Sequence, residues 1–132
     1  MGRRKKEKKR FCIAYLCATG EMHQIQRKED KQERYIREYA AAHNIEIVRV
    51  LRKDVLGMSM VSEHFGMMAY FIEKGRADGV IVSNMEEVST SLSDAYEKIG
   101  VIREAGGEII SVDQINLATE ELEAHYEQKT RI

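Results

Sequence analysis

Reactive side chains gather in two short stretches of this 132-residue sequence. Each stretch follows an apolar run that is typical of a buried strand. The first is residues 17–20 (CATG), and the second is residues 86–91 (EEVSTS). A Thr-Gly turn that enters a helix can hold an anion on its backbone N–H groups, whereas two adjacent carboxylates could act as acid and base. Any chemistry of this chain is therefore expected in these two stretches.

The two stretches support different kinds of site. The pair Glu86 and Glu87 is weak evidence for an enzyme active site, because neighbouring acids on a loop are usually just solvated. A small-molecule or nucleotide site is the alternative, since ligands of open parallel sheets bind at the carboxyl ends of the strands. That edge would present residues 18–20, 84–86 and 113–114. The sequence has neither a G-x-G-x-x-G nor a Walker loop, and the acidic loop disfavours phosphate.

A regular alternation of strands and helices must position these stretches. Apolar or β-branched runs predict the strands, and amphipathic spacing predicts the helices. Strands are expected at 11–17, 45–51, 79–83 and 109–112, and helices at 21–43, 63–74, 92–105 and from 119 onward. The alternation predicts an α/β fold with three layers, a four- or five-stranded, mostly parallel sheet and helices on both faces. The continuous apolar run 79–83 is typical of a central strand.

Capping residues set the expected ends of two helices. Ser62 and Gly75 would bound the helix at 63–74, and residues 54–62 would form a loop before it. Ser91, followed by Asp94, is a variant of the capping box and would begin the helix at 92–105.

Charge is divided sharply along the chain. The formal net charge is −1, but residues 1–10 carry seven Lys or Arg and one Glu, so the rest of the chain carries a net −7. We expect residues 1–10 to be a disordered basic tail and residues 11–132 to be one α/β domain. The tail either contacts phosphates non-specifically or only solubilises the protein. The candidate DNA contacts are Arg3, Arg4, Lys5, Lys6, Lys8, Lys9 and Arg10.

The cysteines and histidines predict no metal or redox chemistry. Cys12 and Cys17 are five positions apart on one expected strand, so they are expected to face opposite sides of the sheet as reduced core residues. No Cys/His pair has the spacing of zinc ligands, and we expect neither metal nor cofactor. No apolar run is long enough for a membrane span, and there is no secretory signal. The expected location is the cytoplasm.

Motifs in matching order resemble the catalytic domain of serine recombinases, the resolvase/invertase family. That family's first strand reads Y-A-R-V-S-T, and residues 14–19 read AYLCAT. Its D-R-x-G-L motif aligns with 63–67 (EHFGM), and its D-R-L-S-R-S loop aligns with 86–91. In its helical run E-N-Q-x-x-x-L-x-x-Y-A, the glutamine corresponds to Gln32. The resemblance extends from about Ile13 to Gln114.

The resemblance implies a family fold in which the DNA-cutting residues are replaced. The nucleophilic serine of the family falls on Ala18, which has no oxygen to attack a phosphate. Phosphoryl transfer needs cations around its transition state, but no family arginine is kept. The family's site positions are occupied here by Leu16, Ala18, His64, Glu86, Glu87 and Thr90. We expect Ala18, His64, Glu86 and Thr90 to converge on one cleft, and we expect no catalytic residue.

The resemblance therefore implies an interaction or regulatory module linked to DNA recombination. Its expected partners are a second copy or an active recombinase, with at most weak, non-specific DNA binding. Residues 111–132 carry five acids and two bases, so no basic DNA-reading helix is expected there. Four methionines offer either an adaptable contact patch or core and loop filling. They are Met58, Met60, Met67 and Met68.

Overall fold

The structure is a computed structural model that describes residues 8–113. Strands and helices alternate along this part of the chain. Their bounds are β1 (Arg10–Leu16), α1 (Met22–Ala42), β2 (Ile45–Arg52), α2 (Ser59–Glu73), β3 (Gly79–Val82), α3 (Met85–Val88), α4 (Leu92–Glu104) and β4 (Glu108–Ser111). The helix expected from residue 119 onward lies outside the described residues. Within 8–113, no helix is both long and apolar enough to cross a membrane.

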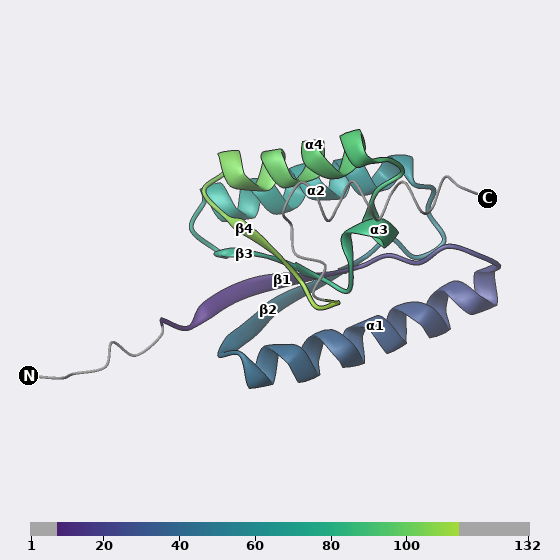
Figure 1. The fold of residues 1–132 in the computed structure, drawn as a ribbon, viewed down its shortest axis with the longest axis horizontal. Coiled ribbons are helices and arrows are strands. Elements are labelled where there is room, and N and C mark those ends of the chain that lie inside the picture. Colours follow the sequence, from purple (N-terminus) through teal and green to yellow (C-terminus); the bar gives the residue numbers. More distant parts are fainter. Residues whose placement is uncertain (1–7, 114–132) are drawn as a thin grey trace, which may run out of the picture.

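The four strands form one parallel sheet in the order β2-β1-β3-β4. Helix α1 covers one face of the sheet, and α2 and α4 cover the other (Figure 1). The predicted three-layer α/β fold is confirmed, with four strands in the described part of the chain. Strand β3 lies between β1 and β4, and all four of its residues are buried. The prediction of a central strand here is therefore confirmed.

Two hydrophobic cores lie on the two faces of this sheet. Side chains alternate along a strand, so Tyr15 of β1 enters the core beneath α2 and α4, and Leu16 enters the core beneath α1. Cys17 belongs to the first core and Cys12 to the second, and both are free and buried. The two cysteines face opposite sides of the sheet, as predicted.

Helix α2 begins four residues earlier than the sequence indicates, at Ser59 rather than at residue 63. Val61 is fully buried and lies one turn before Phe65, which is also buried. The apolar stripe of the helix thus extends back across the expected cap Ser62, and the predicted loop 54–62 is shorter. Gly75 follows the helix with a φ of 72°, the left-handed conformation that glycine supplies at such ends.

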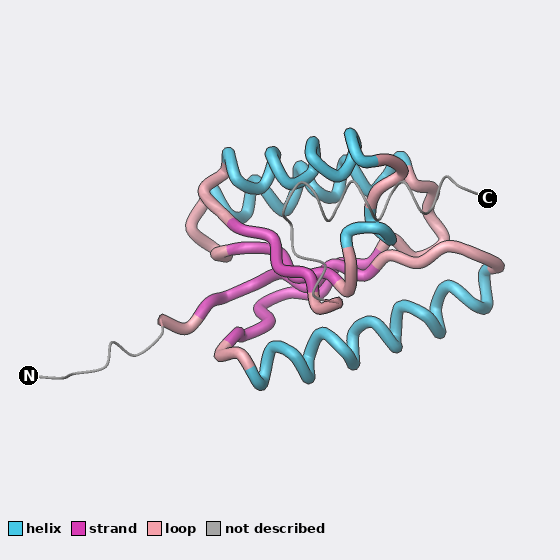
Figure 2. Tube along the Cα trace, viewed as in Figure 1, coloured by secondary structure: helices cyan, strands magenta, loops and turns pink. Residues whose placement is uncertain are grey.

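The polar stretch between β3 and α4 contains the short helix α3, which the sequence did not indicate (Figure 2). Asn84 caps it, because its Oδ1 accepts a hydrogen bond from Glu87 N–H at 2.8 Å. Two of its four residues are buried, which attaches this turn to the core. Helix α4 then begins as predicted, with Ser91 Oγ accepting a hydrogen bond from Asp94 N–H at 3.1 Å.

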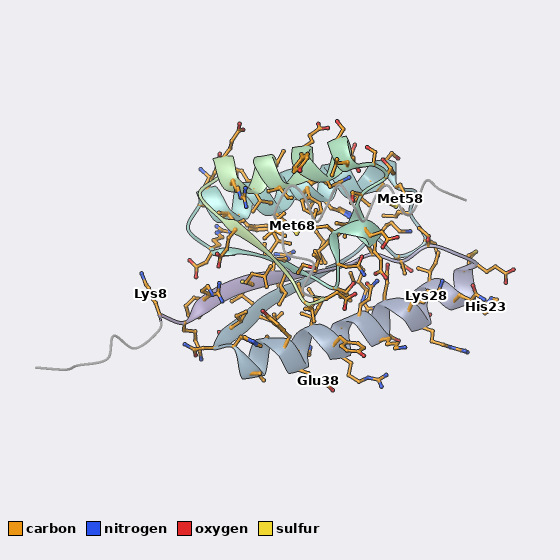
Figure 3. All side chains as sticks on the ribbon, in the orientation of Figure 1. Lys8, His23, Lys28, Glu38, Met58 and Met68 are labelled. Atoms are coloured by element: carbon orange, nitrogen blue, oxygen red, sulfur yellow. The ribbon has the colours of Figure 1, made fainter. Side chains whose placement is uncertain are left out.

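The four methionines do not form one surface patch. Met68 is fully buried between α2 and the sheet (Figure 3). Met58 and Met60 are half-buried, and Met67 is exposed. Core and loop filling is therefore their main role.

Candidate functional site

A cleft of about 610 Å³ lies at the carboxyl ends of β1 and β3. After β1 the chain continues to β2 on one side of this central pair, and after β3 it continues to β4 on the other side. Ligands of open α/β sheets bind at such a reversal of strand order. The cleft is lined by Ala18, Thr19, Lys28, Met58, Glu86, Glu87, Ser89 and Thr90. The two reactive stretches of the sequence therefore meet here.

Three of the four side chains predicted to converge do line this cleft, namely Ala18, Glu86 and Thr90. His64 is not among the lining residues. It is buried, with its Nδ1 at 2.8 Å from the Tyr15 hydroxyl, and burial lowers its pKa. The ring is therefore neutral at neutral pH. Leu16 is fully buried against α1, so it does not line the cleft either.

Gln32, on α1, fixes the backbone just after β1. Its Oε1 accepts a hydrogen bond from Cys17 N–H at 2.9 Å, and its Nε2 donates to Cys17 C=O at 2.7 Å. Nε2 also donates to Glu87 Oε2. Gln32 and Cys17 are both buried, so water does not readily replace these bonds. Gln32 thus holds both the floor of the cleft and one of its acids.

A second buried side chain of α1, Glu29, holds Ala18 itself. Its Oε2 accepts hydrogen bonds from the N–H groups of Ala18 at 3.3 Å and Asp54 at 3.0 Å. Its Oε1 has no hydrogen-bond partner within the described residues and lies 4.0 Å from Arg52 Nη1. Burial raises the pKa of this carboxyl, and the two backbone bonds only partly offset the effect. Glu29 therefore joins the loops that follow β1 and β2.

Glu87 brings a carboxylate to a position where the family resemblance implies an arginine. Its Oε2 accepts hydrogen bonds from the Ser83 hydroxyl at 3.0 Å and from Gln32. Burial raises the pKa of this carboxyl, and its hydrogen bonds lower it by less. With Glu86, it gives the cleft two acidic side chains. When both are ionised, a phosphate in this cleft meets electrostatic repulsion.

Comparison with protein-family models matches residues 18–129 to the family described as "Resolvase, N terminal domain". The chain belongs to the resolvase family. Among solved structures, a resolvase family site-specific recombinase from Streptococcus pneumoniae matches at 16% identity with a TM-score of 0.70, covering 92% of this chain and 88% of that one. The N-terminal catalytic domain of TP901-1 integrase matches at 17% identity with a TM-score of 0.65, covering 92% and 99%.

A third solved structure extends this likeness to another group of recombinases. The C-terminal catalytic domain of ISC1926 TnpA, an IS607-like serine recombinase, matches at 18% identity with a TM-score of 0.62, covering 87% of this chain and 76% of that one. Comparison with curated proteins gave no match. At these identities the likeness shows the fold, and it confirms the expected serine recombinase architecture.

Lys28 places in the cleft of this resolvase-family domain a cation that the sequence motifs did not predict. Its Nζ donates a hydrogen bond to Thr19 C=O at 2.9 Å. Figure 3 shows Lys28 and Met58 at the same end of the molecule. Lys28 precedes Gln32 by four residues on α1, and side chains at this spacing share one face of a helix. That spacing was the available signal.

Cys17, which is next to the position of the family's nucleophile, is a buried thiol and does not line the cleft. Its Sγ donates a hydrogen bond to Glu87 C=O at 3.1 Å, and its side chain belongs to the core beneath α2 and α4. Burial raises the pKa of the thiol to about 12. At neutral pH the group is therefore a thiol rather than the reactive thiolate.

The described end of the basic stretch, residues 8–10, lies away from the cleft. Figure 3 shows Lys8 at the opposite end of the molecule from Lys28. Arg10 is the first residue of β1 rather than part of a tail, and it pairs with a β4 glutamate at 2.6 Å. Lys9 pairs with a β2 glutamate at 3.8 Å. These partners are about half exposed, so the pairs are weak and phosphates can compete for the cations. Residues 3–6 lie outside the described residues.

Proposed function

We propose that this resolvase-family domain does not cut DNA and acts instead as an interaction module. The observation that carries the proposal is the content of the cleft. It presents Ala18, where the family would have its nucleophilic serine, together with the carboxylates of Glu86 and Glu87. A methyl group cannot attack phosphorus, and carboxylates oppose the approach of a phosphodiester.

The expected decrease in the rate of DNA cleavage supports the proposal that this domain does not cut DNA. Removing one group that stabilises the charge of a transition state typically slows a reaction about 10²–10³-fold. The four family arginine positions hold two uncharged side chains, a neutral histidine and the acid Glu87. Lys28 supplies one ammonium to the cleft, whose lining also includes two carboxylates. Restoring a serine hydroxyl therefore does not restore the chemistry.

Ala18→Ser is expected to form no covalent adduct with DNA. The substitution supplies a nucleophile, but the charge of the transition state would still lack its arginines. The intact protein and the variant would be incubated with a supercoiled plasmid library of DNA from the same genome. Denaturing gels would then detect protein–DNA adducts, with an active serine recombinase on its own site as the positive control. A covalent adduct formed by the Ala18→Ser protein would refute the proposal.

Inorganic phosphate gives a control for this experiment that needs no recombination site. NMR titration of the intact protein should leave the amide signals of residues 18–20 and 86–90 in place, because the cleft repels the anion. In Glu87→Arg, the same signals should shift with phosphate. Phosphate-induced shifts of equal size in the unaltered protein would count against the proposal.

The interaction role rests on the retention of the family fold around this altered cleft. Pairing with a second copy or with an active recombinase would use the surface of the domain rather than its cleft, and would make the chain a regulator of recombination by a mobile element. When this chain is added to an active family member acting on its own site, the yield of recombined DNA should change. In the adduct assay of the same mixture, no adduct should contain this chain.

A second candidate function, the binding of a small molecule, is favoured by the position of the cleft at the reversal of strand order. Its volume of about 610 Å³ is within the range of small-molecule sites. The two carboxylates select against a nucleotide phosphate and favour a neutral or cationic ligand. A ligand beside Ala18 in a crystal structure would support this function over the first.

Binding of duplex DNA is expected to depend on the basic tail, because the remaining domain is net negative. Replacing Arg4, Lys5 and Lys6 by glutamine should weaken binding and reduce the slope of log K against log salt by about 2.7, or about 0.9 per cation. Fluorescence anisotropy with a labelled duplex measures both. The matched control replaces three exposed cations of α1, namely Arg27, Lys31 and Arg34. Sequence-specific binding that survives the tail substitutions would contradict the prediction.

A further inference from the structure

A run of aromatic and basic side chains lies outside the cleft, on α2, the turn that follows it and the edge strand β2. We propose that it binds single-stranded nucleic acid. This aromatic–basic strip consists of Arg49, Tyr70, Phe71, Lys74 and Arg76. Lys74 Nζ lies 5.3 Å from the centre of the Tyr70 ring, the centres of the Tyr70 and Phe71 rings are 6.4 Å apart, and Arg49 Cζ lies 4.9 Å from the centre of the Phe71 ring. The two neighbouring rings therefore each have a cation beside them, Lys74 at Tyr70 and Arg49 at Phe71.

The strip is open to a partner. Tyr70 is 56% exposed. Beside it, Arg49, Phe71 and Arg76 line a hollow of about 150 Å³. Val48 also lines this hollow and is exposed, because the register between β1 and β2 shifts here and leaves Val48 without a β1 partner. Such a bulge turns an edge strand away from further strand pairing. The surface is thus suited to side-chain contacts with a ligand rather than to an added strand.

The charges of the strip indicate an anionic ligand. Arg49, Lys74 and Arg76 make no ion pair with any of residues 8–113. Arg52, by contrast, at the end of the same strand β2, lies within 4.0 Å of three carboxylates of α1. The acid next to the strip in sequence is Glu73, which is exposed. Three cations that pair with no carboxylate in the described part of the chain, on a domain that is net negative elsewhere, favour a ligand that brings its own negative charge.

The aromatic rings favour a single-stranded nucleic acid over other anionic ligands. Aromatic side chains stack on the faces of unpaired bases, while nearby cations neutralise the phosphates. A duplex keeps its bases stacked inside, so it could use only the cations. An acidic peptide would likewise leave Tyr70 without a planar partner. Single-stranded DNA and RNA share the required chemistry, and the experiment below separates them.

Tyr70→Ala and Arg49→Gln test the strip in the full chain. Fluorescence anisotropy would be measured with labelled 12-mer single strands of DNA and of RNA, with the matching duplex, and with polyglutamate as competitor. The matched controls are Tyr35→Ala and Arg34→Gln, which make the same changes at exposed positions of α1 on the other face of the sheet. The basic tail is present in every variant, so it cancels from each comparison.

Tyr70→Ala is expected to weaken single-strand binding about 5- to 150-fold, the range for loss of one base-stacking ring. Arg49→Gln should also reduce the slope of log K against log salt by about 0.7. Neither control should change affinity more than about twofold. The RNA and DNA arms then identify which single strand is preferred. The proposal is overturned if the strip variants match their controls, if the duplex binds as tightly as the single strand, or if polyglutamate competes as well as the unlabelled strand.

Discussion

Gln32→Ala is expected to lower the free energy of unfolding by about 2–6 kcal/mol. Gln32 is the hydrogen-bond partner of both the N–H and the C=O of Cys17, and that residue is fully buried. Truncation leaves both groups without a partner and away from water, and each such group costs about 1–3 kcal/mol. Urea unfolding followed by circular dichroism measures the change.

The matched control is Gln26→Ala, which makes the same substitution at an exposed position of α1 and should change stability by less than about 0.5 kcal/mol. Gln32→Glu keeps an acceptor for Cys17 N–H but removes the donor to Cys17 C=O and to Glu87. It should therefore remain destabilised. Equal stabilities of the Gln32→Ala and Gln26→Ala proteins would show that the hydrogen bonds between Gln32 and the Cys17 backbone contribute nothing to the stability of the fold.

Asp94→Ala is expected to destabilise the protein by about 3–5 kcal/mol. Lys98 is only 3% exposed, and its Nζ donates a hydrogen bond to Asp94 Oδ2. Removing one member of a buried ion pair leaves an uncompensated charge, and this costs about 3–5 kcal/mol. Asp94 also accepts a hydrogen bond from Thr90 N–H at 2.9 Å, at the start of α4. Thermal and urea unfolding would measure the loss.

A double variant separates the effect of the unpaired Lys98 charge from the effect of losing the hydrogen bond between Asp94 and Thr90 N–H. Asp94→Ala combined with Lys98→Met removes both charges, so it should be more stable than Asp94→Ala alone. Glu97→Ala, at an exposed position of the same helix, should be nearly neutral. If the double variant is no more stable than the Asp94→Ala protein, the buried ammonium is not the source of the effect.

The same pair sets part of the dependence of stability on pH. Burial by itself would raise the pKa of Asp94, but the hydrogen bonds from Lys98 and Thr90 outweigh it and hold that pKa below its usual 3.8. The folded protein therefore binds this proton less tightly than the unfolded chain does. The resulting stability is present above the ordinary pKa and is lost as the pH falls through the folded value. In Asp94→Ala this part of the acid unfolding curve should be absent.

The fold was predictable because its signals are local. Apolar runs mark β1 to β4, and caps such as Ser91 and Gly75 mark helix ends, so each element could be read from its own residues. The exceptions are the start of α2 and the whole of α3. Val61 lies in a stretch whose local sequence indicates a loop, and its place in α2 is set by tertiary packing, which buries it fully. Helix α3 is a single capped turn, too short for any helical period to show.

The cleft was predictable only in part, for a different physical reason. Ala18, Glu86 and Thr90 lie in motifs whose order places them together once the fold is known. Glu29 is fully buried, yet a charged residue in a polar helix is normally expected at the surface. Its hydrogen bonds reach backbone groups 11 and 25 residues away. Such contacts depend on the assembled layers and leave no pattern in the sequence.

The support of residue 18 has a consequence for how this architecture can change over time. Gln32 and Glu29 hold the chain at Cys17 and Ala18 entirely through backbone groups. The side chain at position 18 takes no part in that support, so exchanging alanine for serine leaves all of these hydrogen bonds in place. The backbone bonds therefore give folding little means to distinguish alanine from serine here, and activity is the property on which the two residues differ.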